Sequence, residues 1–159
     1  MILALGIDPG TATTGYGLVR LSPDGELVAV KHGVISTPKD AAPPARLEMI
    51  YDQMRDLLKE HRPDTAAVEK LYFARNVTTG IAVGQARGVV LLAIQKAGLE
   101  AFEYTPKEIK NAVAGYGGAD KRQVQEMVRA LLQLDSIPKP HDAADALALA
   151  ITHLHTTRY

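Results

Sequence analysis

The sequence predicts an α/β fold in which a five-stranded mixed sheet carries helices on both faces. Three apolar runs of strand length come first and are separated by turn residues: 2–8, 15–21 and 27–35. Segments with helical spacing then alternate with two more short strands, at 65–69 and 99–104. Strands joined by hairpins are antiparallel and strands joined through helices are parallel, so this order predicts a mixed sheet.

The first apolar run, Ile2–Asp8, is nearly continuous, which is typical of a central strand buried on both faces. Asp8-Pro9-Gly10 then turns the chain, because proline cannot donate to a neighbouring strand. Ser22-Pro23-Asp24-Gly25 has the composition of a hairpin turn between the second and third strands. The proline-containing segment from Ser36 to Pro44 is expected to be a loop.

Five helical segments are expected after the third strand: 47–58, 78–96, a helix from 105, 120–134 and a helix from about 141. Apolar residues in the first of them recur every three or four positions, and Pro63 lies beyond its end. Thr105-Pro106-Lys107-Glu108 combines a capping residue, a proline in the first turn and a glutamate three positions later. Gly115–Gly118 then ends that helix.

At 159 residues, the chain is expected to form a single domain, 1–159. It contains no cysteine, which excludes disulfides and thiolate metal ligands and is compatible with a cytoplasmic location. The longest apolar stretch, Gly88–Ile94, is too short to span a bilayer. The formal net charge is zero. This counts against nucleic-acid binding unless basic residues cluster or metal ions overturn the charge of an acidic site.

Four carboxylates give the strongest indication of function. Asp8 ends the first apolar run and Glu69 ends the fourth predicted strand. Asp142 and Asp145 share one face at the start of the last helix. If the first and fourth strands are parallel neighbours, as in a ribonuclease H-like fold, these acids meet at one edge of the sheet. Because close carboxylates repel one another unless divalent cations lie between them, we expect a metal-dependent enzyme that hydrolyses phosphate esters.

Each acid also has an ordinary structural interpretation. Asp142 suits the N-cap of the last helix and Asp145 suits its dipole, and this pair alone favours capping. Asp8 is also explained as a turn residue, and Glu69 as a solvated strand end. The predicted convergence of all four acids at one end of the sheet favours the metal site.

Two segments beside the acids carry further signals. Small and hydroxyl-bearing residues at 10–15 either let a phosphate approach the backbone or simply make a tight turn. Tyr72 and Phe73 lie between basic residues, where they either stack on an unpaired base or close the end of the sheet.

Gly80, Gly84 and Gly88 share one face of a predicted helix and allow another helix to approach closely. A two-fold dimer interface is our preferred interpretation, and packing within one chain is the alternative. Basic residues in the C-terminal helices either grip phosphates or are simply solvated: Lys107, Lys110, Lys121, Arg122 and Arg129.

With these residues laid out, the chain resembles the RuvC family of bacterial Holliday junction resolvases along its whole length. The matching blocks are Gly6-Ile7-Asp8-Pro9-Gly10, Thr14-Gly15-Tyr16-Gly17, Glu69 with Ala74-Arg75-Asn76, Gly84-Gln85-Ala86-Arg87-Gly88, Gly118-Ala119-Asp120-Lys121 and Asp142-Ala143-Ala144-Asp145-Ala146-Leu147. The blocks are highly specific together, although any single block is not.

This resemblance implies a ribonuclease H-like homodimer that nicks four-way DNA junctions symmetrically in recombination and DNA repair. It implies two Mg²⁺ or Mn²⁺ ions per active site. By position, the catalytic metal ligands fall on Asp8, Glu69, Asp142 and Asp145. Some relatives carry a histidine at the position of Asp142. The resemblance also implies the branch-migration proteins RuvA and RuvB as partners.

The family resemblance assigns DNA contacts and a dimer helix as well. The DNA-binding residues are expected to be Tyr72, Phe73, Arg75, Asn76, Lys110, Lys121 and Arg122. Tyr72 stands where the family usually has phenylalanine, so either Tyr72 or Phe73 can provide the stacking ring. The helix with Gly84 and Gly88 corresponds to the family's dimer helix.

The implied chemistry is two-metal phosphodiester hydrolysis, in which Asp8 bridges the ions and the roles of the other acids are open. An acid followed by a glycine-rich turn also opens actin-like ATPases and sugar kinases. At 159 residues, the chain is too short for their second lobe and adenosine loop. A non-catalytic junction-binding dimer is the other alternative, and it would need the acids only as caps and solvated groups.

Overall fold

The computed structural model describes residues 1–70 and 77–157, and its strands form a single five-stranded sheet. In chain order the strands are β1 (Ile2–Asp8), β2 (Thr13–Leu21), β3 (Leu27–Ser36), β4 (Thr65–Glu69) and β5 (Ala101–Tyr104). Their order across the sheet is β3-β2-β1-β4-β5. β1 pairs antiparallel with β2 and parallel with β4, so the sheet is mixed, as predicted.

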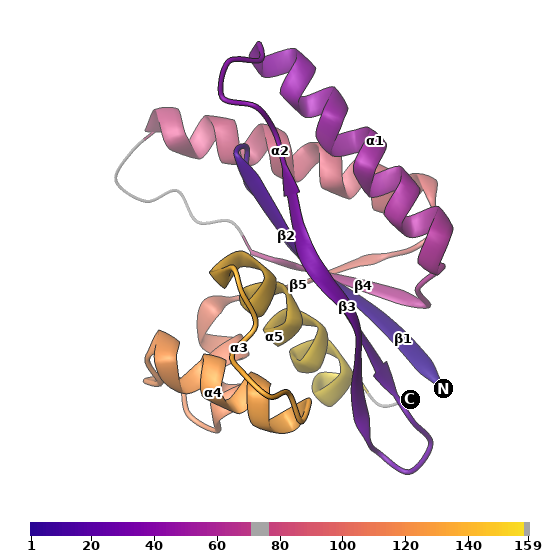
Figure 1. Cartoon of the computed structure of the whole chain (residues 1–159), viewed down its shortest axis with the longest axis vertical. Helices are drawn as coiled ribbons and strands as arrows, with labels where there is room; N and C mark the ends of the chain where they lie inside the picture. Colours follow the sequence, from indigo (N-terminus) through magenta and orange to yellow (C-terminus); the bar gives the residue numbers. More distant parts are fainter. Residues whose placement is uncertain (71–76, 158–159) are drawn as a thin grey trace.

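Helices cover both faces of the sheet (Figure 1). One face carries α1 (Pro43–His61) and α2 (Val77–Lys96). The other carries α3 (Pro106–Ala114), α4 (Lys121–Leu131) and α5 (His141–Thr156). The alternation of side chains along β1 divides the core in two, because Ala4 contributes to the α5 side while Leu5 and Ile7 contribute to the α1–α2 side.

Glycines on the sheet let α5 lie directly against the backbone of β1 and β2. A Cβ atom at Gly6 would overlap the carbonyl of Ala146, and one at Gly15 would overlap the carbonyl of Asp142. At Gly17 an added Cβ would approach the Leu147 side chain and backbone within 2.9 Å. Because the helix comes this close, its first turn is placed beside the end of β1.

Several element boundaries differ from the predictions. β2 begins at Thr13 rather than at residue 15, and β5 begins at Ala101 rather than at residue 99. α1 begins at Pro43, inside the segment expected to be a loop, because proline fits the first turn of a helix. α4 ends at Leu131 rather than at residue 134, and Gln133 then takes a left-handed conformation with φ of 54°. The predicted capping box of Thr105 and Glu108 is present, and Asp120 and Gln123 form a second one. No helix in the described part of the chain is long and apolar enough to cross a membrane.

Candidate metal centre

The ends of β1 and β4 bring the first two acids together. The strands are parallel neighbours, with Ile7 opposite Val68, so Asp8 and Glu69 are the next residues on each strand. Both side chains are half-buried and line one small pocket. The two predicted strand-end acids therefore lie side by side at the carboxyl edge of the sheet.

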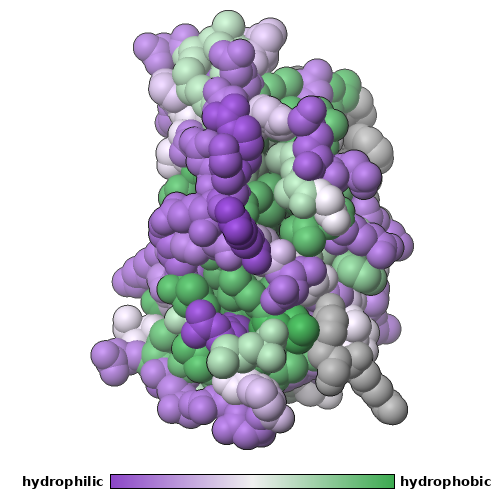
Figure 2. All heavy atoms as spheres, turned by 90° about the vertical axis from the view of Figure 1, so that its right-hand side faces the viewer, coloured by the Kyte–Doolittle hydropathy of each residue, from purple (hydrophilic) through white to green (hydrophobic). Residues whose placement is uncertain are grey.

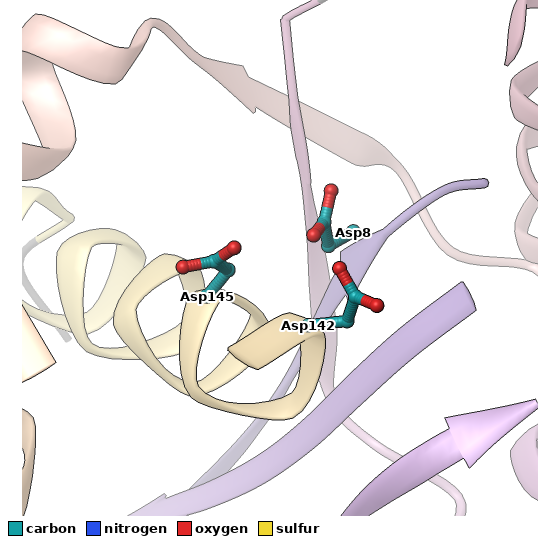
Figure 3. A group of neighbouring side chains, drawn as sticks. All are labelled: Asp8, Asp142 and Asp145. Carbon is teal, nitrogen blue, oxygen red and sulfur yellow. The ribbon is translucent and has the colours of Figure 1, made fainter. Parts of the chain in front are cut away.

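The first turns of α5 supply the other two acids. Asp8, Asp142 and Asp145 each offer a carboxylate oxygen, and these oxygens lie within 4.8 Å of one another. Figure 3 shows the three carboxyl groups pointing toward one space beside the end of β1. Gly15 pairs with Asp8 and faces the backbone of Asp142, so close packing at this glycine sets the position of the helix next to the strand.

Capping does not explain the acids of α5. The helix begins at His141, with Pro140 at the N-cap position, and no side chain of the described residues caps it. The interpretation of Asp142 as the N-cap is therefore wrong, because that position belongs to Pro140. Asp142 and Asp145 instead point toward Asp8, as the metal-site prediction requires.

The electrostatic environment of Asp8 is that of a crowded, buried acid. The pKa of Asp8 is raised to about 8, most of all by burial and then by the charges of Glu69, Asp145 and Asp142, in that order. A side-chain hydrogen bond with Asp142 adds to this effect. Without a compensating cation, Asp8 therefore keeps its proton at neutral pH.

The pKa values of Glu69 and Asp145 are also raised, mainly by burial. Lys121 opposes this at both acids, because its ammonium lies 3.6 Å from Asp145 and favours the charged carboxylates. Glu69 is outside the tight group of three oxygens but is coupled to it through the charges of Asp8 and Asp145. The donor set consists of carboxylate oxygens alone, which fits hard cations such as Mg²⁺ or Mn²⁺.

A cleft of about 290 Å³ opens beside the acids, between α3, α4 and α5. Two acids, Glu69 and Asp145, line it together with two lysines, Lys110 and Lys121. Ile109 and Val124 contribute an apolar wall. The two lysines expected to contact DNA therefore lie next to the acids.

The turn after Asp8 is held by its own hydroxyl groups. Thr14 is fully buried, and its hydroxyl donates to the Gly10 carbonyl over 2.7 Å. The Thr11 hydroxyl donates to the Ala82 carbonyl on α2, over 3.2 Å. These hydroxyls fix the turn in place, which fits the tight-turn interpretation of this segment.

Several other predicted residues lie away from the acids or outside the described chain. Arg122 is exposed on α4 and contacts Glu126 over 3.1 Å. Gly80, Gly84 and Gly88 all lie on α2, and a Cβ at Gly88 would meet open space. Tyr72, Phe73, Arg75 and Asn76 fall outside the described residues.

A buried histidine network connects the elements that carry the acids. His153 on α5 is fully buried; its Nε2 lies 2.7 Å from the Thr65 hydroxyl, and its Nδ1 lies 2.6 Å from the Tyr104 hydroxyl. Burial lowers the pKa of His153, so the neutral ring is favoured. Thr65 begins the strand that ends at Glu69, and Tyr104 pairs with Glu69, so the network joins α5 to both β4 and β5.

Sequence reasoning missed this network and the packing role of the glycines on the sheet. Tyr104 and Thr65, which join His153 to the sheet, are 49 and 88 residues away in the sequence, so no local pattern marks them. The glycines did stand out within motifs, but a motif does not reveal which helix lies against it. Arg87 is also close to the site, because its side chain contacts Glu103 and the Glu69 carbonyl.

Comparison with known proteins gives a consistent result. The sequence profile described as "Crossover junction endodeoxyribonuclease RuvC" matches residues 4–153. A protein of that description from Chloroflexus aurantiacus is 56% identical over 153 residues, covering 96% of this chain and 93% of the relative. Another, from Rubrobacter xylanophilus, is 56% identical over 154 residues, covering 97% and 86%.

Solved structures agree with the sequence comparison. RuvC from Thermus thermophilus superposes with a TM-score of 0.90 at 35% identity, covering 97% of this chain and 94% of that one. T. thermophilus RuvC in complex with a Holliday junction substrate gives a TM-score of 0.89 at 32% identity, with the same coverage. The yeast mitochondrial Holliday junction resolvase Ydc2, at 15% identity and a TM-score of 0.70, covers 96% and 78% and shows a shared fold. The predicted ribonuclease H-like fold is confirmed.

Proposed function

Because the chain belongs to the RuvC family of crossover junction endodeoxyribonucleases, we propose that Asp8, Asp142 and Asp145, with Glu69, form its metal-dependent catalytic centre. The chain is a nuclease that acts on Holliday junctions. The observation that carries the proposal is the convergence of three carboxylate oxygens within 4.8 Å of one another. A stable protein holds such like charges together when a function requires them.

Each acid receives a role from its position. Two divalent ions, Mg²⁺ or Mn²⁺, would when bound lower the pKa of the attacking water and stabilise the departing 3′-oxygen. The charges of all three other acids act on Asp8, so Asp8 is suited to hold both ions. Glu69 and Asp145 flank it on different elements, and Asp142 is suited to hold an ion or to orient the water. The proposed products carry a 5′-phosphate and a 3′-hydroxyl.

The lysines beside the acids are proposed to grip the DNA backbone. Lys110 and Lys121 line the same cleft as Glu69 and Asp145, and the Lys121 side chain is 60% exposed. A phosphate that enters this cleft would meet both ammonium groups on its way to the acids. Arg122, Tyr72, Phe73, Arg75 and Asn76 are proposed to add DNA contacts, as the family resemblance implies.

The outward face of α2 is proposed to form a two-fold dimer. Ile81 and Leu92 are 54% and 53% exposed, and their spacing of eleven residues puts them on one face of the helix. Gly88 lies between them on that face, where no atom of the described residues lies within 4 Å of an added Cβ. A dimer formed here would present one acidic centre to each of two strands of a junction, which explains paired cuts.

The remaining assignments follow from the family alone. We propose that the chain works as a single nuclease domain in the cytoplasm, where its DNA substrate is found in bacteria. RuvA and RuvB are its proposed partners in branch migration.

The decisive experiment compares wild-type protein with Asp8→Asn on a synthetic four-way junction in Mg²⁺, Mn²⁺ or EDTA. Cleavage by the variant should fall by at least about 1000-fold, because several kcal/mol of transition-state stabilisation is lost. Junction binding should persist. Asp40→Asn, an exposed aspartate in the loop before α1, is the matched control and should cut normally.

Cleavage by Asp8→Asn near the wild-type rate, or equal cleavage in EDTA, would refute the catalytic assignment. Hydrolysis of ATP without DNA would instead favour the kinase-like alternative. Binding without cleavage by the wild-type protein in both metals would favour the non-catalytic junction-binding dimer.

A further inference from the structure

A second cleft lies at the other end of the molecule, between the C-terminal parts of α1 and α2. Its volume is about 530 Å³, and Tyr51, Leu58, Ala93 and Leu99 form its apolar floor. Figure 2 looks onto the side where both helices end and shows hydrophobic side chains between hydrophilic ones. Pro63, just before β4, also lines the cleft, whereas Glu69 ends that strand. At ~3.3 Å per residue, the strand separates the cleft from the acids by roughly 17 Å.

The charged side chains that line this cleft are all basic: Arg55, Lys59, Arg62 and Lys96. Arg55 is neutralised by Asp52 and Asp56 on its own helix. Within residues 1–70 and 77–157, no carboxylate lies within ion-pair distance of Lys59, Arg62 or Lys96. The chain as a whole has a formal net charge of zero, so three unpaired cations around one cleft are a local concentration of positive charge.

The backbone at Arg62 provides an independent observation. Arg62 ends α1 in the left-handed region, with φ of 47° and ψ of 59°, and its N–H donates to the Leu58 carbonyl. Glycine is the favoured residue at this position, because a side chain is strained there. The chain carries an exposed arginine instead, at the rim of the cleft. Such local strain is typical of residues whose side chain has a function.

We propose that this cleft binds an acidic peptide segment of another protein. One apolar side chain of the peptide would lie on the floor near Leu58 and Ala93, while its carboxylates pair with Lys59, Arg62 and Lys96. A nucleic acid could use the cations but would leave the apolar floor unused. A second copy of this chain is disfavoured as the occupant, because two basic clefts repel each other.

The test uses an array of ten-residue peptides probed with the full-length protein. Each peptide carries four aspartates and either one apolar residue (Leu, Ile or Phe) or a serine in its place. The variants are Lys59→Glu with Lys96→Glu, and a matched double reversal, Lys31→Glu with Lys39→Glu, at exposed lysines outside the cleft. Fluorescence anisotropy then measures the affinity for the strongest peptide.

The expected result is that peptides with both acids and an apolar residue bind wild-type protein and the matched control. Reversal at Lys59 and Lys96 should weaken binding at least tenfold. Arg62→Gly should also weaken binding, yet its melting temperature should be equal or higher because glycine relieves the left-handed strain. A purely structural role for Arg62 would not separate these two readouts.

Three results would overturn the proposal. The first is the absence of binding to any peptide, or binding that the serine replacement or the double reversal leaves unchanged. The second is a larger loss of junction affinity in the Lys59–Lys96 reversal than in the control, which would make the cleft a DNA surface. The third is loss of self-association in that reversal alone, which would make it an interface between copies. Junction cleavage should be unaffected, so failure here leaves the nuclease assignment intact.

Discussion

The two faces of the sheet are packed by different means. α5 lies against β1 and β2 through glycines, so that backbone meets backbone at Gly6 and Gly15. α1 and α2 are held on the opposite face by large side chains, among them Ile50, Met54 and Ile94. The first kind of packing has no free space and fixes position, whereas the second can relax when a side chain changes. The positions of the proposed catalytic acids depend on the α5 face, which cannot relax.

Among changes in packing, the largest effect on cleavage should therefore come from a single methyl group at Gly15. In Gly15→Ala the added Cβ would overlap the Asp142 carbonyl, so α5 must move away from the sheet. We expect junction cleavage to fall at least about 100-fold and the free energy of unfolding to fall by about 3 kcal/mol. Cleavage assays and urea unfolding measure the two effects. Normal cleavage by this variant would show that the site tolerates displacement of the helix.

The next effect concerns the pH dependence of stability in EDTA. The pKa of Asp8 is about 8 in the folded chain and 3.8 for an ordinary aspartate, so between these pH values the folded state holds the extra proton. The stability associated with protonated Asp8 is complete below about pH 4 and is lost as the pH rises through 8. Asp8→Asn should remove this loss and exceed wild type by more than about 1 kcal/mol at pH 9. Parallel wild-type and variant curves from pH 5 to 9 would contradict the crowding of the acids.

His153 should make stability depend on pH in the opposite direction, with a smaller effect on the free energy of unfolding. Burial lowers the pKa of His153 below the ordinary histidine value of 6.5, so the unfolded chain binds the proton first as the pH falls. Stability from the neutral ring is present above pH 6.5 and is lost as the pH falls toward the folded-state pKa. His153→Phe should abolish this acid dependence and cost about 1–3 kcal/mol at pH 8, because two hydroxyls lose their partner. If urea unfolding shows the same loss of stability below pH 6.5 in the variant as in wild type, His153 is not the cause of that loss.

The smallest effect on cleavage should come from a change on the face that carries α1 and α2. Met54 lies on α1 and is fully buried, and Met54→Ala should destabilise the protein by about 2–5 kcal/mol. Cleavage per folded molecule should change less than about twofold, since the α5 face is untouched. Circular dichroism gives the folded fraction, and single-turnover cleavage gives the rate. A drop comparable with that of Gly15→Ala would mean that the two faces are not mechanically separate.

Prediction from the sequence succeeded where local pattern and strand order carry the information. The apolar run before Asp8 and the short run before Glu69 mark buried strands, and parallel pairing then brings their ends together. The same reasoning left Asp142 ambiguous, because a helix start suits both a cap and a ligand. Only the position of Pro140 at the N-cap decides between them.

The contacts between distant segments were beyond prediction. Gly15 lies against Asp142 although most of the sequence separates them. His153 likewise contacts Thr65 and Tyr104, which are distant in the sequence. The basic cleft is hidden for the same reason, since Lys59 and Lys96 look like ordinary solvated helix ends until the two helices are placed together.

The proton on Asp8 has a consequence for the order in which the complex assembles. With Asp8 neutral and the pKa values of Glu69 and Asp145 raised, the acidic edge repels DNA less than its four carboxylates suggest. Lys110 and Lys121, the proposed phosphate contacts in the neighbouring cleft, would then hold a phosphate at this edge without a metal ion. We therefore expect the protein to bind a junction in EDTA, before any divalent cation is present.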